Sequence, residues 1–282
     1  MTITRFAPSP SGLLHLGHAY SALFAEASAR RDGGRFLLRI EDIDFTRCRR
    51  EFEERLMEDL GWLGLVWEQP VRRQSEHLDA YAAVADTLRS RGLIYPCFCT
   101  RRDILREIEQ AGGAPQEGAE GPLYPGICRG LSEDERSARL AAGEGHAWRL
   151  DLAKALETIG PEPLVWRDLG RGEIVAQPER LGDAVLVRKD IGTSYHVAVV
   201  WDDALQGVTR VTRGEDLWES THLHRVLQAL LGLPVPEYHH HGLIRDESGR
   251  RLAKRDEAEP LGALREAGAS PESVRARLGF GE

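Results

Sequence analysis

The sequence lacks the features that mark membrane, secreted and disulfide-rich proteins. It contains no apolar run of about 18 residues, so no transmembrane helix is expected. Its amino end, MTITRFAPSPSG, lacks the basic and apolar regions of a secretory signal. Four cysteines among 282 residues are too few for a disulfide scaffold and favour a reducing compartment. We therefore expect a cytoplasmic protein without membrane contact.

Lysine is also scarce. The three lysines are Lys154, Lys189 and Lys254, so arginine supplies nearly all of the positive charge. A net charge of -8 argues against a chain built mainly to coat nucleic acid. Because arginine binds phosphates bidentately, a local RNA face can still exist, for instance at Arg47–Arg50 or Arg101–Arg102. Solvated helix faces are the alternative.

Short apolar stretches alternate with helix-forming stretches along the first third of the chain. We expect strands at 3–6, 35–40 and near 65–67, and helices at 16–31, 47–60 and 76–91. Strands that alternate with helices of this length need crossover connections. The pattern therefore predicts an α/β protein with a doubly wound parallel sheet.

The rest of the chain changes character at Cys97. Residues 97–145 are rich in Gly, Pro and charge, and we interpret them as an inserted, loop-rich module. Further strands are expected at 148–151, 164–167, 173–176, 184–188, 194–201, 208–213 and 242–244, with a helix at 216–231 and short helices at the end. The expected domains are a first catalytic half (1–96), the insert (97–147), a second catalytic half (148–259) and short C-terminal helices (260–282).

The segment RFAPSPSGLLHLGH carries the clearest chemical signal. A strand leads into a proline-stiffened loop, and His15 and His18 then lie in the first turn of a helix. Free backbone N–H groups and the helix dipole favour an anion there, Gly17 leaves room for a nucleotide, and the imidazoles can donate to phosphate oxygens. Core histidines, two metal ligands or a chance HxxH are the alternatives.

This segment resembles the first signature of the class I aminoacyl-tRNA synthetases, in the subgroup for glutamate and glutamine. The resemblance continues through Arg39–Asp44, Arg213–Leu217 and Arg251–Arg255, in the family's order and over most of the chain. It implies the class I nucleotide-binding fold and a two-step reaction. The α-carboxylate of an amino acid attacks the α-phosphate of ATP, and an RNA hydroxyl then takes the acyl group. Such chemistry depends on positioning and charge neutralisation, and Mg²⁺ is expected with the ATP phosphates.

The resemblance implies a catalytic and ATP-binding set. Its members are His15, Gly17, His18 and Lys254. Lys254 lies in the second signature loop, where it is a mobile point charge suited to phosphates. That loop departs from the family pattern, because Arg251 stands at a lysine position and Ala253 at a serine position. Without the first motif, an ordinary charged hairpin loop would be the preferred interpretation.

A glutamate pocket is implied at the ends of the predicted strands. Arg5 can supply a fixed cation for the side-chain carboxylate, and Glu41 can accept from the substrate ammonium. Both follow parallel strands at their carboxyl ends, where doubly wound sheets bind ligands. By resemblance the pocket contains Arg5, Phe6, Ala7, Pro8, Ser9, Glu41, Tyr195 and Arg213. Alone, Glu41 would be interpreted as a surface salt-bridge partner.

The insert offers soft metal ligands. Cys97, Cys99 and Cys128 supply three thiolates for one tetrahedral Zn²⁺. By resemblance to one branch of the family, Tyr124 is the fourth ligand. A phenolate is unfavourable at neutral pH, but a bound cation can stabilise it. Asp103 or His146 are alternatives, as are three buried reduced thiols without metal. The run His239–His241 points to both faces of a strand, so we expect part of the nucleotide pocket there.

The stretch after Arg255 has room for two short helices and none for an anticodon-binding domain. Within the family the chain therefore resembles a truncated branch that activates L-glutamate with ATP in the absence of tRNA. That branch transfers glutamate to the queuosine base in the anticodon arm of tRNA(Asp), and we expect a monomer. Transfer to a tRNA 3′ end, another adenylate-forming ligase and a non-catalytic RNA-binding paralogue are the alternatives.

Overall fold

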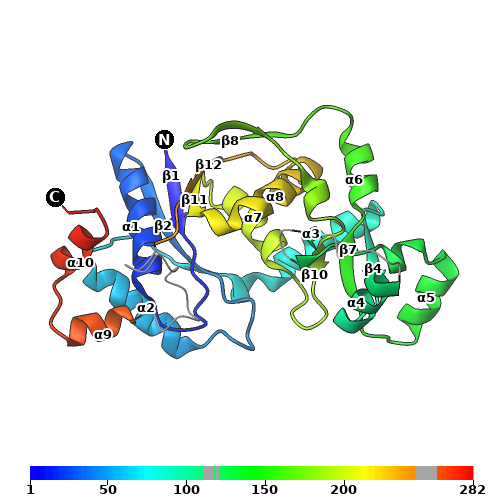
Figure 1. Cartoon of the computed structure of the whole chain (residues 1–282), viewed down its shortest axis with the longest axis horizontal. Helices are drawn as coiled ribbons and strands as arrows, with labels where there is room; N and C mark the ends of the chain where they lie inside the picture. The colour runs from blue at the N-terminus through cyan, green and yellow to red at the C-terminus, as the bar shows by residue number, and fades with distance from the viewer. Residues whose placement is uncertain (111–116, 119–120, 245–258, 282) are drawn as a thin grey trace.

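Two groups of parallel strands lie side by side in the half of the molecule that holds both termini (Figure 1). The computed structural model describes residues 1–110, 117–118, 121–244 and 259–281. The first sheet has the order β1 (Ile3–Phe6), β2 (Arg35–Ile40), β3 (Arg72–Arg73). The second has the order β11 (Arg210–Gly214), β12 (Glu237–His241), β8 (Val165–Asp168), β9 (Gly172–Val175), with β9 antiparallel. They meet where the Thr209 N–H donates to the Ile3 carbonyl at 3.0 Å.

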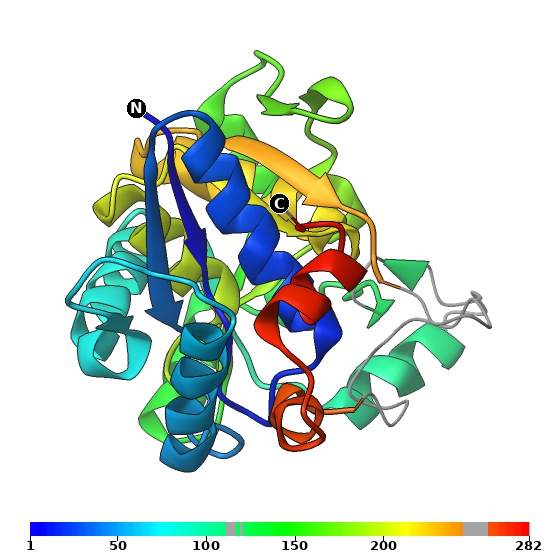
Figure 2. The ribbon, with the colours of Figure 1, turned by 90° about the vertical axis from the view of Figure 1, so that its left-hand side faces the viewer.

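Helices cover one face of the first sheet, and residues of the second sheet pack on the other face. The helices of this half are α1 (Leu16–Arg31), α2 (Arg50–Trp62), α9 (Leu261–Glu266) and α10 (Pro271–Arg277). Phe36, Leu38 and Ile40 of β2 share a core with α1, whereas Leu37 packs on the second sheet. Figure 2 shows α1 lying across β1 and β2 with α10 beside it. Because alternate residues of β2 face opposite sides, the first sheet contacts two hydrophobic cores.

The other half is built on an antiparallel sheet of β10 (Val185–Val187), β7 (Ala147–Leu150) and β4 (Ile94–Cys97). Its α-helices are α3 (Leu78–Ser90), α4 (Arg101–Gln110), α5 (Glu133–Ala141), α6 (Leu152–Ile159), α7 (Tyr195–Leu205) and α8 (Trp218–Leu231). The 3₁₀ turns are η1 (Gln74–His77), η2 (Ile127–Gly130), η3 (Pro178–Arg180) and η4 (Glu215–Leu217), and β5 (Glu117–Gly118) pairs with β6 (Gly121–Pro122). Within the described ranges, no helix is long and apolar enough to cross a membrane.

The predicted elements agree best at the amino end. The strands at 3–6 and 35–40 and the helix at 16–31 are confirmed residue for residue. The strand predicted at 194–201 is wrong, because this stretch opens α7, whose first turn is capped by the Ser194 hydroxyl accepting from the Val197 N–H. An apolar run that is buried on all sides does not distinguish strand from helix. Three valines within it favoured the strand.

Other predictions fail for related reasons. The stretch 97–145 is more regular than expected, because it contains α4 and the mostly exposed α5, which has no fully buried residue. A capping box between Ser132 and Glu135 begins α5. Residues 65–67 form no strand, and the last strand is β12 rather than 242–244. The sheets are mixed, since β4, β7, β9 and β10 pair antiparallel.

Truncation of a core side chain of α1 should destabilise the fold. Leu23 is fully buried between α1 and the first sheet. We expect Leu23→Ala to lower the free energy of unfolding by about 2–5 kcal/mol, measured by urea denaturation. Leu205→Ala, at a position 58% exposed at the end of α7, is the control and should change it by less than about 0.5 kcal/mol. Equal effects of the two variants would contradict this packing.

Candidate active site

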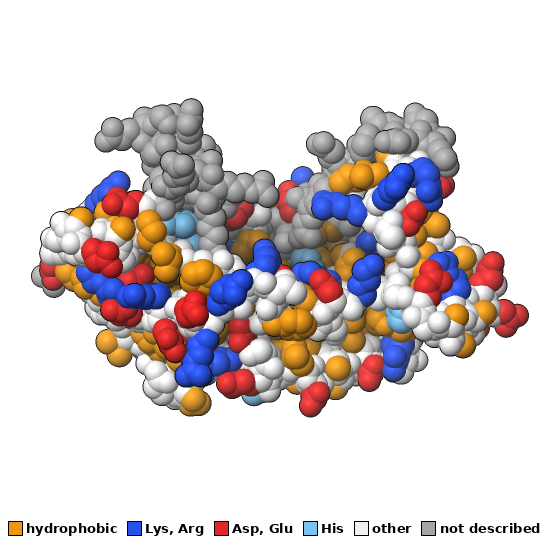
Figure 3. Space-filling view, turned by 90° about the horizontal axis from the view of Figure 1, so that it is seen from below, with side chains coloured by type: hydrophobic (Ala, Val, Ile, Leu, Met, Phe, Trp, Pro, Cys, Tyr) orange, Lys and Arg blue, Asp and Glu red, His pale blue; other side chains and the backbone are white. Residues whose placement is uncertain are grey.

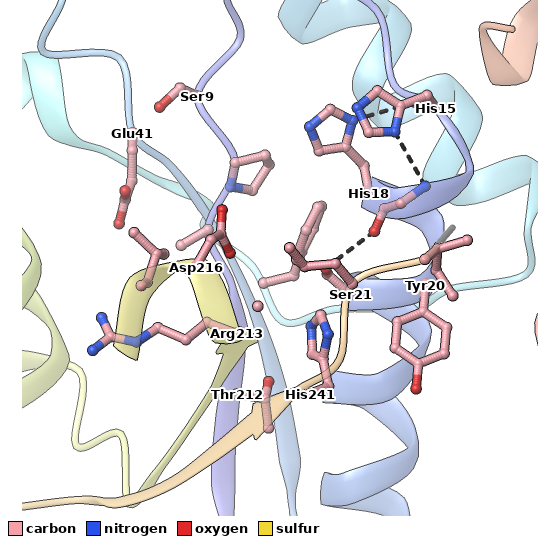
Figure 4. A pocket seen from close by; sticks show the side chains of 18 of the residues that line it. Ser9, His15, His18, Tyr20, Ser21, Glu41, Thr212, Arg213, Asp216 and His241 are labelled. Atoms are coloured by element: carbon pink, nitrogen blue, oxygen red, sulfur yellow. Dashed lines mark hydrogen bonds between the residues drawn. The ribbon is translucent and has the colours of Figure 1, made fainter. Parts of the chain in front are cut away.

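A cavity of about 450 Å³ opens where the two parallel sheets meet. It lies at the carboxyl ends of β1, β2 and β11, the region where open α/β sheets bind ligands. Among its lining are Arg5, Phe6, Ala7, Pro8, Ser9, His15, Gly17, His18, Glu41, Tyr195 and Arg213. Figure 4 shows Glu41 and Arg213 on one side of it and His15 and His18 of α1 on the other. The structure thus brings together the predicted catalytic, ATP-binding and glutamate-binding residues, except Lys254, which lies outside the described residues with Arg251 and Ala253.

The two histidines cap the helix that they begin. The Gly17 N–H donates to His15 Nδ1 at 3.1 Å, and the His15 N–H donates to His18 Nδ1 at 3.2 Å. The expected free N–H groups are therefore partly used, because His18 and Ala19 also donate to the His15 carbonyl. Since both Nδ1 atoms accept, each neutral ring carries its proton on Nε2. Each imidazole then carries a donor, Nε2–H, in addition to the Nδ1 atom that caps the helix.

Arg5 is held from beneath the cavity by Asp203 of α7. Its Nε and Nη2 donate to the two oxygens of Asp203 at 2.9 and 3.3 Å, and its Nη1 donates to the Thr212 carbonyl at 3.1 Å. Arg39 donates to the same carboxylate at 2.8 Å and is fully buried. Burial raises the pKa of Asp203, but the two arginines outweigh this effect and the net pKa is lowered. One carboxylate thus fixes two guanidinium groups.

Glu41 is buried at the end of β2 rather than exposed. Its carboxylate accepts from Arg39 Nη2 at 3.0 Å. Burial raises the pKa of Glu41 in spite of Arg39 and Arg5 nearby. A cation arriving in the cavity would favour the ionised carboxylate, so Glu41 is suited to receive an ammonium group.

Arg213 differs from Arg5 in the charge of its partners. Its Nε donates to His240 at 3.1 Å, its Nη1 to the Tyr195 hydroxyl at 3.1 Å, and its Nη2 to the Thr221 hydroxyl at 2.5 Å. His224 Nδ1 lies 3.4 Å from Nη1. These partners are uncharged, because burial lowers the pKa of both His240 and His224. Arg213 is therefore a buried cation whose charge is available to an anion in the cavity.

The side chains of the three consecutive histidines of β12 lie in different surroundings. His241 lines the cavity, whereas His240 lies beneath Arg213 and His239 packs against the Phe24 ring, 4.7 Å between centroids. Neither His239 nor His240 lines the cavity. The expectation that this run forms part of the pocket wall thus holds for His241 alone. His240 faces the other side of the strand, and His239 shares the side of His241 but packs against Phe24.

A second cavity of about 600 Å³ adjoins the first through Tyr195, which lines both. Basic side chains of its lining are Arg101, Arg149, Arg188 and Lys189. It extends from α7 to the cysteine-bearing end of β4. Figure 3 shows one face of the molecule, on which Lys and Arg side chains are scattered among acidic ones.

The three predicted cysteines come together at the end of β4. The Sγ atoms of Cys97, Cys99 and Cys128 all lie within 4.8 Å of one another, and Cys99 and Cys128 are 3.5 Å apart. A tetrahedral Zn²⁺ with Zn–S bonds of about 2.3 Å separates its sulfurs by about 3.8 Å, so the spacing fits. The Tyr124 hydroxyl lies 3.6 Å from Cys99 Sγ.

Neither alternative fourth ligand joins this group. Among the described residues the metal-ligating cluster contains the three cysteines alone. Asp103 accepts from Thr100 and Arg106 at the start of α4, and His146 Nδ1 contacts the Glu144 carbonyl at 2.9 Å. The Arg149 guanidinium lies 4.0 Å from the centre of the Tyr124 ring, a distance typical of a cation–π contact.

Sequence reasoning missed the residues that act from beneath the cavity. They are Arg39, Asp168, Asp203, Thr221 and His224, while His240 was predicted in the pocket wall and lies beneath it. Arg39 belongs to the Arg39–Asp44 motif, but that motif does not indicate that Arg39 is buried. A signal for Asp203 was present, since two adjacent acids in an apolar run need buried partners.

Comparisons with known proteins agree with this geometry. A family model described as the catalytic domain of class I tRNA synthetases (E and Q) matches residues 1–280. A protein of Rhodobacter capsulatus called Glutamyl-Q tRNA(Asp) synthetase is 52% identical over 99% of this chain and 100% of its own. The Glutamate--tRNA ligase of Aquifex aeolicus is 40% identical over 96% of this chain and 55% of its own.

A similar solved structure is a glutamate tRNA ligase from Elizabethkingia meningosepticum in complex with its amino acid. The match has a TM-score of 0.81 and 29% sequence identity, and it covers 98% of this chain. This chain spans 60% of that protein.

Removal of the Asp203 charge should destabilise the protein strongly. Asp203→Asn leaves Arg5 and Arg39 without their shared carboxylate, so we expect about 3–5 kcal/mol less stability in urea denaturation at pH 7. Because the pKa of Asp203 is lowered in the folded state, its contribution is present above the unfolded pKa near 4. It is lost as the pH falls toward the folded value, so the difference from wild type should shrink on acidification.

The control for this prediction is an exposed ion pair. Asp86 pairs with Arg89 at 3.0 Å on α3, and both side chains are more than half exposed. Solvent screens such pairs, so Asp86→Asn should cost less than about 1 kcal/mol. An Asp203→Asn variant as stable as Asp86→Asn would contradict the described network.

Proposed function

The chain belongs to the class I tRNA synthetase family for glutamate and glutamine, a family of ligases, and we propose that it activates L-glutamate with ATP in the absence of tRNA. We propose further that it acts as a monomer and transfers the glutamyl group to the queuosine base in the anticodon of tRNA(Asp). The observation that carries the first step is a single cavity with a buried, charge-unmatched Arg213 on one side and the His15–His18 pair on the other.

The glutamate half of the site follows from charge. A dicarboxylic amino acid brings two carboxylates and one ammonium, and the cavity offers Arg5, Arg213 and the Tyr195 hydroxyl to the former and Glu41 to the latter. Because Arg213 has only neutral partners, a substrate carboxylate gains a full opposite charge there. Phe6, Ala7, Pro8 and Ser9 complete the wall of this half.

The ATP half lies at the amino end of α1. His15 and His18 would donate through Nε2 to phosphate oxygens as negative charge builds on them, beside Gly17. Lys254 is proposed to add a mobile cation, and Mg²⁺ accompanies the ATP. An oxygen of the glutamate α-carboxylate then attacks the α-phosphorus, the bond to the bridging oxygen of pyrophosphate breaks, and glutamyl-adenylate forms. Holding both reactants in one cavity supplies the positioning that this step needs.

The transfer step is proposed to use the second cavity. Its basic residues suit an RNA backbone, and Tyr195 forms the boundary with the glutamate site. The relatives of which this chain covers most of the length are called Glutamyl-Q tRNA(Asp) synthetase, whereas it covers 55% of the Aquifex aeolicus ligase. The name of the Rhodobacter capsulatus relative, at 52% identity, supports the queuosine base as the proposed acceptor.

We also propose that residues 97–147 form a zinc module held by Cys97, Cys99, Cys128 and Tyr124. The sulfur spacing supports three thiolate ligands, and the Tyr124 hydroxyl next to Cys99 is the proposed fourth. Burial raises the pKa of Tyr124, so the metal would have to favour its phenolate. The ion would fix the end of β4 and with it one wall of the second cavity.

Activation is tested by pyrophosphate exchange. The purified chain should incorporate labelled pyrophosphate into ATP when glutamate is present and RNA is absent. Arg213→Ala should lower kcat/KM for glutamate by about 100-fold or more, because a charge-assisted contact is lost. Arg167→Ala, a largely exposed arginine of β8, should leave exchange unchanged. Absence of exchange by the wild-type protein would overturn the proposal.

Transfer is tested with labelled glutamate and two tRNA(Asp) preparations, one with queuosine and one with guanosine at the same position. Only the queuosine-bearing tRNA should be labelled. Normal charging of the 3′ end of a glutamate tRNA would contradict the proposed acceptor and leave the activation step intact.

Metal content gives a third test. The protein purified without chelator should contain about one zinc per chain by mass spectrometry of the metal. Cys128→Ser and Tyr124→Phe should both lower this content, the former more because a thiolate is the stronger ligand. Cys48→Ser is the control, since Cys48 lies outside the cysteine cluster. Full zinc content in the Cys128→Ser protein would contradict the site.

A further inference from the structure

We infer that His240 is a positioning residue for glutamate recognition: its neutral ring, oriented by Asp168, aims Arg213 at the cavity without cancelling the charge of the guanidinium. The inference rests on the proposed function, since it concerns the same site. His240 does not line the cavity, so any effect on the substrate must pass through Arg213.

Hydrogen bonding determines where the His240 ring holds its proton. Arg213 Nε is a permanent donor, and it lies 3.1 Å from His240 Nε2, which must therefore accept. The proton then resides on Nδ1, which lies 2.8 Å from Asp168 Oδ2. Burial and the nearby Arg213 lower the pKa of His240 to about 4, so the ring is neutral at pH 7.

Asp168 is itself fixed from three directions. Besides the ring of His240, the backbone N–H of His240 donates to Oδ2 at 3.1 Å and the N–H of Gly170 donates to Oδ1 at 2.9 Å. The side chains of Asp168 and His240 are both fully buried. The Asp168–His240 pair is therefore held in one orientation. His240 in turn orients the Arg213 guanidinium at the end of β11.

Aromatic rings enclose this pair. Trp218, Trp166 and Tyr238 have ring centroids 5.0, 5.8 and 5.9 Å from that of His240. Their packing limits water beside Nε2, so that the Arg213 contact is not replaced by solvent.

Because the His240 ring is neutral, it does not offset the charge of Arg213. Arg5 meets a carboxylate at 2.9 Å, which offsets its charge within the protein. Arg213 forms no ion pair with any residue in the described part of the chain, and its partners are two ring nitrogens and two hydroxyls. The His240 ring separates the Asp168 carboxylate from Arg213. Asp168 therefore orients His240, and the charge of the Arg213 guanidinium can pair with a substrate carboxylate.

The test compares three variants in glutamate-dependent pyrophosphate exchange. His240→Ala removes the acceptor and should raise KM for glutamate about tenfold or more, with KM for ATP unchanged. His240→Gln retains a neutral acceptor and should restore KM for glutamate to within about threefold of wild type. His222→Gln is the matched control. It is a buried α8 histidine that accepts from the Gln177 N–H and does not line the cavity, so both KM values should be unchanged.

The outcomes separate this inference from the proposed function. If wild type shows no exchange, the proposed function fails. If wild type exchanges and His240→Ala keeps its KM for glutamate, or raises both KM values equally, the positioning role is refuted. A second measurement does not depend on the variants being stable. ¹⁵N-histidine NMR of the wild-type protein should show His240 protonated at Nδ1 alone, and a proton on Nε2 would overturn the inference.

Discussion

The structure depends on the pairing of one buried carboxylate, Asp203, with arginines from two strands. Arg5 of β1 and Arg39 of β2 both donate to it, which ties α7 to the first sheet. The neighbouring Asp202 accepts from Arg72 of β3 and from Tyr81 of α3. Because buried charges are tolerated only when paired, α7 can occupy one position. Its first residue, Tyr195, is thereby delivered to the boundary between the two cavities.

The two arginines of the cavity are stabilised in opposite ways, and the difference has a functional meaning. Arg5 is matched by a carboxylate, so its burial costs little and its orientation is rigid. Arg213 is surrounded by neutral acceptors. Its buried charge therefore destabilises the protein until an anion binds in the cavity. A site built in this way favours an acidic amino acid over its neutral amide, because only the carboxylate offsets that cost.

The sequence predicts β1, α1 and β2 residue for residue and names about half of the residues that line the cavity. Strand β1, helix α1 and strand β2 follow from local pattern, because their periods and breaks are unambiguous. Helix α7 does not, since an apolar run with valines gives no period, and its true signal was the Ser194 cap with Asp202 and Asp203. Motif residues could be carried to the cavity by resemblance. Their supports could not, because partners such as Asp168 and His240 meet only through the tertiary fold.

The caps of α1 explain why histidine, rather than serine or aspartate, begins this helix. A carboxylate cap would satisfy the first N–H groups but would place negative charge where phosphates are proposed to bind. A hydroxyl cap would satisfy them and offer one short donor. An imidazole accepts through Nδ1 and still presents Nε2–H on its far side. His15 and His18 therefore combine capping with donation, which ties the stability of α1 to the chemistry proposed at its end.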